Sequence, residues 1–171
     1  MSSDEVKLNL GCGRDIKKGY VNIDAIKRDG VDVVMDLASE DLPFANGSVD
    51  HINLQDIIEH FYHNQIDWFI EVCYQKLKSG GTIYIQTPDL EVLCERYCGV
   101  LEKPTSIQHN LDGNQLAQSL FAYSDSTAIY DNHKWCYDRH TLTHLLTRHG
   151  FIVLSIGSDG GQNLLCQAKK E

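Results

Sequence analysis

The sequence predicts an α/β protein with an open, mostly parallel sheet that finishes in an antiparallel hairpin. Short apolar runs typical of strands alternate with segments of helical periodicity along the 171 residues, a pattern typical of a sheet covered by helices. Glycines, acids and amides follow directly after several of these runs. They would therefore lie at the carboxyl ends of strands, where open α/β sheets bind ligands.

The expected elements follow one another in a simple order. We predict strands over Val6–Leu10, Val21–Ile23, Val31–Met35, Val49–Leu54, Thr82–Gln86, Phe151–Ile156 and Leu164–Ala168. Helical spacing predicts helices over Ile57–Leu77, Leu90–Gly99 and Thr141–His149, with Ser79–Gly81 ending the first of them in a left-handed glycine cap. Residues from about 100 to 134 are polar and irregular, and form an insert in a single domain spanning 1–171.

Composition narrows the possible partners and the compartment. A net charge of −9 argues against sequence-independent binding to nucleic acid, which needs a basic surface, so we expect no nucleic-acid partner. No apolar stretch reaches membrane-spanning length, and the N-terminal residues lack the features of a signal peptide. The six cysteines include no Cys-x-x-Cys pair. We expect reduced thiols, a cytoplasmic location and no membrane partner.

The stretch Leu8–Gly13, followed by Asp24, is the most informative motif. Glycines at 11 and 13 let the backbone turn sharply and approach a ligand, and a carboxylate at the next strand tip can accept ribose hydroxyls. Only 11 positions separate Gly13 from Asp24, whereas dinucleotide folds place their acid about 20 residues on. A full crossover helix barely fits in Arg14–Tyr20, so we predict a shortened one and an adenosine-containing cofactor.

The ordered motifs of the chain resemble the class I S-adenosylmethionine-dependent methyltransferases, and most resemble a short bacterial subgroup often associated with cell-surface sugar pathways. The matching segments are Leu8–Gly13, Asn22–Asp24, Asp36-Leu37, Leu42–Phe44, Ser48–Asp50, Ile58–Phe61 and Leu77–Gly81. The resemblance implies a Rossmann-like seven-stranded sheet, S-adenosylmethionine as cofactor, and in-line methyl transfer to a small-molecule or saccharide-type acceptor.

The same resemblance implies roles for individual positions. The turn Gly11-Cys12-Gly13 would line the methionine end of the cofactor, and Asp24 would bind the ribose. Asp36 and Leu37 would border the adenine, and Gln55 would lie near the sulfonium.

Three departures from the family pattern affect the site. Asp15 stands where the first motif of the family usually has its third glycine, and few residues precede the first strand, so we expect the usual lid helix to be absent. The pocket is then open, or completed by a second copy or a partner subunit. Asp56 stands where the subgroup often has histidine and is a catalytic candidate. For Glu59 and His60 we favour a structural role, since acids suit a first helical turn.

Among the later histidines, His133 is the candidate general base. It closes the insert that forms the acceptor side in the resembling group, and an oxygen acceptor benefits from a base with a pKa near the working pH. The aromatic neighbours Trp135 and Tyr137 fit the acceptor side and the core equally well. His140 and His144 are spaced i, i+4, but no further ligand completes a set, so we predict no metal site.

Two rival functions stay open at this stage. A chain with this motif can bind S-adenosylmethionine or S-adenosylhomocysteine without transferring methyl, as a regulatory subunit. An NAD-dependent oxidoreductase is disfavoured, because a pyrophosphate needs a nearby helix N-terminus and a third glycine, whereas position 16 is Ile.

Overall fold

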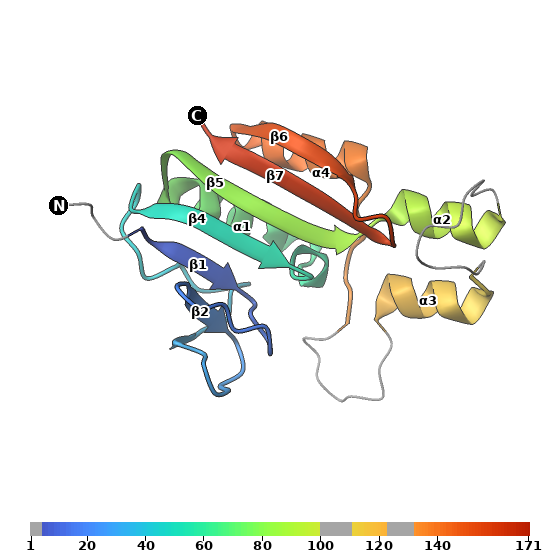
Figure 1. Ribbon diagram of the computed structural model, residues 1–171, viewed down its shortest axis with the longest axis horizontal. Helices are drawn as coiled ribbons and strands as arrows, with labels where there is room; N and C mark the ends of the chain where they lie inside the picture. Colours follow the sequence, from blue (N-terminus) through green and yellow to red (C-terminus); the bar gives the residue numbers. More distant parts are fainter. Residues whose placement is uncertain (1–4, 100–110, 123–131) are drawn as a thin grey trace.

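One seven-stranded sheet organises the protein. The computed structural model describes residues 5–99, 111–122 and 132–171. The strands are β1 (Lys7–Leu10), β2 (Val21–Asp24), β3 (Val33–Val34), β4 (Val49–Gln55), β5 (Leu77–Pro88), β6 (Phe151–Ser158) and β7 (Asn163–Lys170), in the order β3-β2-β1-β4-β5-β7-β6 (Figure 1). Strand β7 runs antiparallel to both β5 and β6, and the other pairs are parallel. The predicted mostly parallel sheet with a C-terminal antiparallel hairpin is confirmed.

Apolar rows cross the sheet on one face and form the core. One row joins Leu10, Leu54, Ile85 and Cys166 as cross-strand partners, and each of these side chains is buried. Helices α1 (His63–Lys76) and α4 (Arg139–Arg148) lie behind the sheet in Figure 1 and cover this face. The alternation of apolar and polar residues along each strand thus selects the side on which helices pack.

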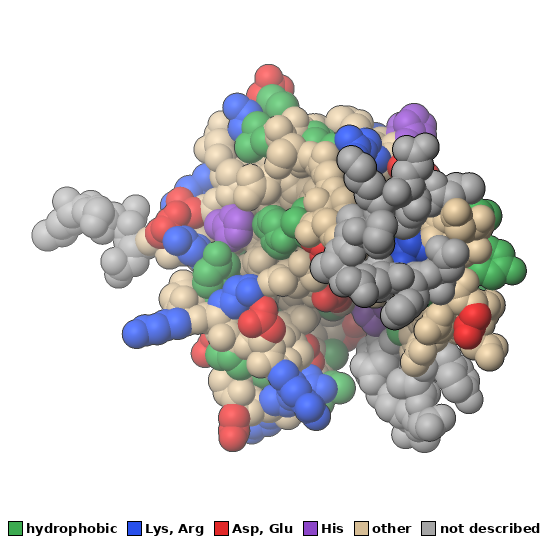
Figure 2. Space-filling view, turned by 45° about the vertical axis from the view of Figure 1, so that its right-hand side comes forward, with side chains coloured by type: hydrophobic (Ala, Val, Ile, Leu, Met, Phe, Trp, Pro, Cys, Tyr) green, Lys and Arg blue, Asp and Glu red, His purple; other side chains and the backbone are tan. Residues whose placement is uncertain are grey.

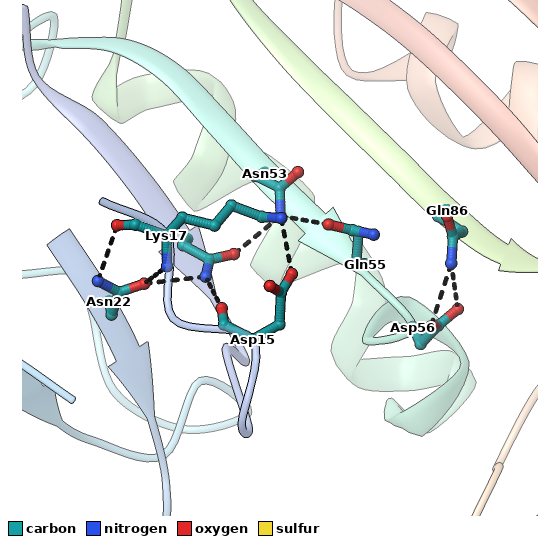
Figure 3. Close-up of polar contacts among 8 residues, drawn as sticks. Asp15, Lys17, Asn22, Asn53, Gln55, Asp56 and Gln86 are labelled. Atoms are coloured by element: carbon teal, nitrogen blue, oxygen red, sulfur yellow. Dashed lines mark hydrogen bonds and ion pairs between the residues drawn. The ribbon is translucent and has the colours of Figure 1, made fainter. Parts of the chain in front are cut away.

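The opposite face carries a row of asparagines. The side chain of Asn53 donates to Oδ1 of Asn9 at 2.8 Å, and Asn9 donates to Oδ1 of Asn22 at 3.0 Å. Asn9 also donates to the carbonyl of Asp15, and Asn22 accepts from the backbone N–H of Lys17 (Figure 3). These bonds tie the connection between β1 and β2 down onto the sheet.

The connection Arg14–Tyr20 is built of turns and contains no helix. The predicted shortened crossover helix is therefore wrong. Side chains that bond nearby backbone groups compete with helix formation, and the asparagine row does so across this short connection.

The segment after β4 is divided where one helix was expected. A 3-10 turn, η1 (Ile58–His60), precedes α1, which ends at Lys76 instead of running on to a glycine cap. Leu77 has extended backbone and pairs with Val49, so the predicted cap Ser79–Gly81 lies inside β5. Pairing with β4 outweighs the helix-ending signal of the two glycines.

Two helices lie beyond the carboxyl ends of the strands (Figure 1): α2 (Leu90–Cys98) and α3 (Gly113–Phe121). Helix α3 belongs to the insert predicted to be irregular, and Asp112 caps it by accepting from the N–H of Gln115 at 2.8 Å. The rest of that insert, residues 100–110 and 123–131, lies outside the described residues. Among the described residues, no helix is both long enough and apolar enough to cross a bilayer.

Candidate cofactor and acceptor site

The turn after β1 requires glycine for two separate reasons. Gly11 and Gly13 have φ angles of +64° and +52°, in the left-handed region that other residues rarely adopt. A Cβ on Gly11 would also lie 2.1 Å from Cδ1 of Ile57, so the first glycine lets the segment after β4 pack directly on the turn. The backbone of the turn thereby lines a cavity instead of being covered by its own side chains.

Asp24, at the tip of β2, is held by three donors. Its Oδ2 accepts from the N–H of Gly13 at 2.8 Å, and its Oδ1 accepts from the N–H of Ile26 at 2.8 Å and from Arg28 at 3.1 Å. These bonds orient the carboxylate at the edge of the same cavity. A carboxylate has about four acceptor positions, so Asp24 retains capacity for a ligand hydroxyl.

A cavity of about 360 Å³ lies between the tips of β1 and β2 and the segment that follows β4. Of the predicted site residues it is lined by Gly11, Gly13, Asp24, Asp36, Leu37 and Asp56. Residues that the sequence did not single out for the cofactor also line it: Arg28, Ile57, His60, Tyr62, Gln65 and Lys134.

Three predicted residues do not line this cavity: Cys12, Gln55 and His133. Cys12 is buried beneath the turn, and burial raises the pKa of its thiol to about 11, so it is not a nucleophile at neutral pH. Gln55 accepts from Asn53 at 3.5 Å, on the side of the asparagine row (Figure 3).

Asp36 begins the turn that borders the far end of the cavity. Its carboxylate accepts from the N–H of Ala38 at 2.9 Å and from the hydroxyl of Ser39 at 3.0 Å. The residue therefore shapes its own turn, and at the same time it and Leu37 present an acid and an apolar surface to the cavity.

Asp56 follows β4 in a strained backbone conformation, with φ of +52°. Its N–H donates to the carbonyl of Gln86, and the Gln86 amide donates to both carboxylate oxygens at 3.2 Å (Figure 3). Burial raises the pKa of Asp56 above its usual value. Strain of this kind collects at functional sites, and Asp56 lines the cavity.

Glu59 is buried just behind Asp56, with 1% of its surface exposed. Its Oε2 accepts from the hydroxyl of Thr87 at 3.0 Å, while Oε1 has no hydrogen-bond partner and lies 3.9 Å from Nε2 of His133. Burial raises the pKa of Glu59 to about 8. The sequence favours a structural role for Glu59, whereas only the structure shows that its Oε1 is buried without a hydrogen-bond partner.

His60 and His133 meet next to Glu59. Their rings contact edge to face with centroids 4.9 Å apart, and burial lowers the pKa of His133. The backbone N–H groups of Lys134 and Trp135 donate to the carbonyl of Glu59, which fixes this pairing of distant segments. The spacing of Asp56, Glu59 and His60 was the sequence signal for this group, but only the fold adds His133 to it.

The remaining candidates lie apart from this group. His140 and His144 are exposed on α4. Among the described residues, no group of three possible metal ligands includes them. Tyr137 is buried in the core cluster, whereas Trp135 is exposed and contacts His63. In the face seen in Figure 2, acidic and basic side chains are interspersed.

The fold and the cavity define an α/β domain with a cavity at the tips of its first strands. A model of the methyltransferase-domain family matches residues 8–85. No curated protein matches the sequence. The matched residues contain the glycine turn, Asp24, Asp36 and the segment Asp56–His60.

Solved structures of low sequence identity share the fold. A Pyrococcus horikoshii protein is 17% identical with a TM-score of 0.65, covering 100% of this chain and 84% of that one. A SAM-dependent methyltransferase from Archaeoglobus fulgidus is 16% identical with a TM-score of 0.63, covering 98% and 87%. A chain from the complex of the Haloferax volcanii Trm112 methyltransferase activator with a methyltransferase is 16% identical with a TM-score of 0.61, covering 98% and 83%.

The matched family model is that of a methyltransferase domain, and the chain is similar in fold to solved S-adenosylmethionine-dependent methyltransferases. The cofactor of this family is S-adenosylmethionine.

Proposed function

We propose that this chain transfers a methyl group from S-adenosylmethionine to a small-molecule or saccharide-type acceptor. One observation carries the proposal: the glycine turn and Asp24 line the same cavity as Asp56 and His60. The proposed donor site and two titratable side chains thus share one cavity.

The residues at the donor side fit the cofactor. A Cβ on Gly13 would meet nothing within 4 Å, so the backbone there is open to a ligand. Asp24 is the proposed acceptor for the ribose hydroxyls, and Asp36 with Leu37 the proposed border of the adenine. When bound, the cofactor supplies a methyl group activated on a sulfonium.

The chain's contribution to the reaction is positioning and proton transfer. Holding an acceptor atom in line with the methyl group contributes several kcal/mol, up to roughly 7–11 kcal/mol in the best-oriented cases. Asp56 lines the cavity, and His133, which does not, contacts His60 at its wall; His133 and Asp56 are the proposed groups that orient an acceptor hydroxyl or take its proton. Because burial lowers the pKa of His133, its imidazole is neutral at neutral pH and available as a base.

A second chain is the proposed cover for the open side of the cavity. Ile26 and Tyr62 line the cavity and are 36% and 56% exposed, which leaves an apolar rim in water. The Haloferax volcanii chain is solved in a complex with an activator. Native mass spectrometry of the chain, alone and with cofactor, tests whether a second copy is this cover. A homo-oligomer would support a second copy, and a monomer would leave a different protein as the candidate.

The experiment that tests the function is transfer of a labelled methyl group. Wild type and Asp24→Asn would be incubated with methyl-labelled S-adenosylmethionine and pools of sugar nucleotides and small metabolites. Labelled product from wild type alone supports the proposal. Cofactor binding without transfer to any acceptor pool would instead indicate a regulatory, binding-only subunit. Binding of NAD in place of S-adenosylmethionine would indicate an oxidoreductase.

A further inference from the structure

Three side chains that can bind a metal ion gather at and behind the wall of the cavity. One carboxylate oxygen of Glu59 and one ring nitrogen each of His60 and His133 lie within 4.8 Å of one another. Glu59 and His60 come from η1, and His133 from the end of the insert, so the group is assembled by the fold. We propose that Glu59, His60 and His133 bind a divalent metal ion.

The first support is the buried oxygen Oε1 of Glu59. It makes no hydrogen bond, and with only 1% of the residue exposed it has no access to water. The other oxygen, Oε2, accepts a hydrogen bond from Thr87. An unsatisfied buried polar atom costs about 1–3 kcal/mol, and more where it is charged. A cation bound at Oε1 would remove this cost.

The second support is the direction in which the histidine nitrogens point. Nδ1 of His133 lies 3.2 Å from the carbonyl of Ser119, and Nδ1 of His60 lies 3.3 Å from the carbonyl of Asn132. A carbonyl only accepts, so each Nδ1 carries the proton that it donates there, and Nε2 of His133 presents a lone pair toward Oε1 of Glu59. Metal-binding histidines characteristically donate their other N–H to such an acceptor.

A direct hydrogen bond does not explain the arrangement. Nε2 of His133 and Oε1 of Glu59 are 3.9 Å apart, which is too long for an O–H···N bond even if Glu59 is protonated. An ion between Nε2 of His133 and Oε1 of Glu59 would explain why two acceptors face each other across this gap.

The donor set indicates the class of ion. Two imidazoles and one carboxylate suit first-row divalent ions such as Zn²⁺, Mn²⁺ or Co²⁺, and three protein ligands leave a position open. His60 and Asp56 line the cavity, so the open position can face an acceptor there. With a metal bound, His133 is a ligand instead of a base, and Asp56 remains the proposed proton acceptor.

The test is metal binding by the full chain, first stripped with chelator and then dialysed against Co²⁺, Zn²⁺, Mn²⁺ or Mg²⁺. We expect one Co²⁺ per chain with the visible absorption of nitrogen and oxygen ligation. His133→Ala and Glu59→Gln should weaken binding about 10-fold or more. Glu59→Gln keeps an acceptor for Thr87, which preserves the local fold. His140→Ala, on the exposed face of α4, is the matched control and should bind as wild type does.

Three outcomes would overturn the proposal. These are the absence of stoichiometric Co²⁺ binding, equal binding by wild type and both ligand variants, or loss of binding in His140→Ala. Calorimetry with S-adenosylhomocysteine on the same samples tests the donor site separately, so failure of methyl transfer and failure of metal binding are distinguishable.

Discussion

Arg28 lies with its guanidinium 3.1 Å from Oδ1 of Asp24, four residues away along the chain. The arginine therefore contacts the carboxylate that is proposed to receive the ribose. Oδ1 already accepts from Ile26 and from Arg28, whereas Oδ2 accepts only from Gly13, so a ribose hydroxyl can bind at Oδ2, and a second one at Oδ1 would take the place of the arginine. The pair is partly exposed, and such pairs contribute under about 1 kcal/mol, so displacement is inexpensive.

Replacing Arg28 tests whether it competes with the cofactor. Arg28→Ala should bind S-adenosylhomocysteine at least as tightly as wild type, because an acceptor position on Asp24 becomes free. Lys27→Ala is the control for the loss of one positive charge. Calorimetry gives the dissociation constants. A loss of affinity confined to Arg28→Ala would mean that the guanidinium contacts the cofactor itself.

The contact between Gly11 and Ile57 predicts a coupled pair of mutations. Gly11→Ala should destabilise the fold by about 1–3 kcal/mol through overpacking, in addition to its backbone strain. Gly13→Ala carries similar strain without the clash, and is the control. Ile57→Ala should relieve much of the cost of Gly11→Ala in a double-mutant cycle measured by urea unfolding. Additive costs would show that Ile57 does not set the requirement for glycine.

The asparagine row predicts a stability effect away from the cavity. Asn9→Leu leaves the Asn53 amide group and the carbonyl of Asp15 without their partner, at a cost of about 1–3 kcal/mol for each unsatisfied buried group. The melting temperature should fall by roughly 2–4 °C per kcal/mol. Asn46→Ala, at an exposed position, should change it little. An unchanged melting temperature for Asn9→Leu would mean that the row does not hold the connection.

The fold was largely predictable because periodicity and glycine turns are local signals. The parallel strands and the final hairpin follow from alternation along the chain and from the loop Gly157–Gly161. The fate of Ser79–Gly81 was not predictable, since it depends on pairing of Leu77 with a strand far away in the sequence. The missing crossover helix likewise depends on contacts between Asn9, Asn22 and Asn53 on three different strands.

His51 predicts how stability depends on pH. Burial, helped by Lys7, lowers the pKa of His51 in the folded chain below its ordinary value of about 6.5. The folded state therefore resists protonation, so the stabilisation is present above the unfolded pKa and is lost as the pH falls through the folded pKa. Wild type should lose more unfolding free energy between about pH 7.5 and about pH 5.5 than His51→Gln, which keeps a partner for Thr82. Identical losses in urea titrations at both pH values would contradict this.

The lining of the cavity was predictable from the sequence around the glycine turn and Asp24, and not around Glu59. The glycine turn and Asp24 are close in sequence, and each lies at the end of a strand, so one local motif indicated both. The grouping of Glu59 and His60 with His133 was not predictable. It depends on backbone hydrogen bonds that Lys134 and Trp135 donate to the carbonyl of Glu59. No local pattern contains that contact.

Calorimetric titration with S-adenosylhomocysteine tests the central claim, that this cavity is a methyl-donor site. We expect saturable binding to wild type and about 10-fold or greater weakening in Asp24→Asn, since hydrogen bonds to a charged group contribute about 1.5–3 kcal/mol. Asp32→Asn, in which an acid that accepts from the backbone of Asn22 is changed outside the cavity, should bind as wild type does. NAD should give no heat of binding. Equal affinity of wild type and Asp24→Asn, or binding of NAD instead of S-adenosylhomocysteine, would contradict the account.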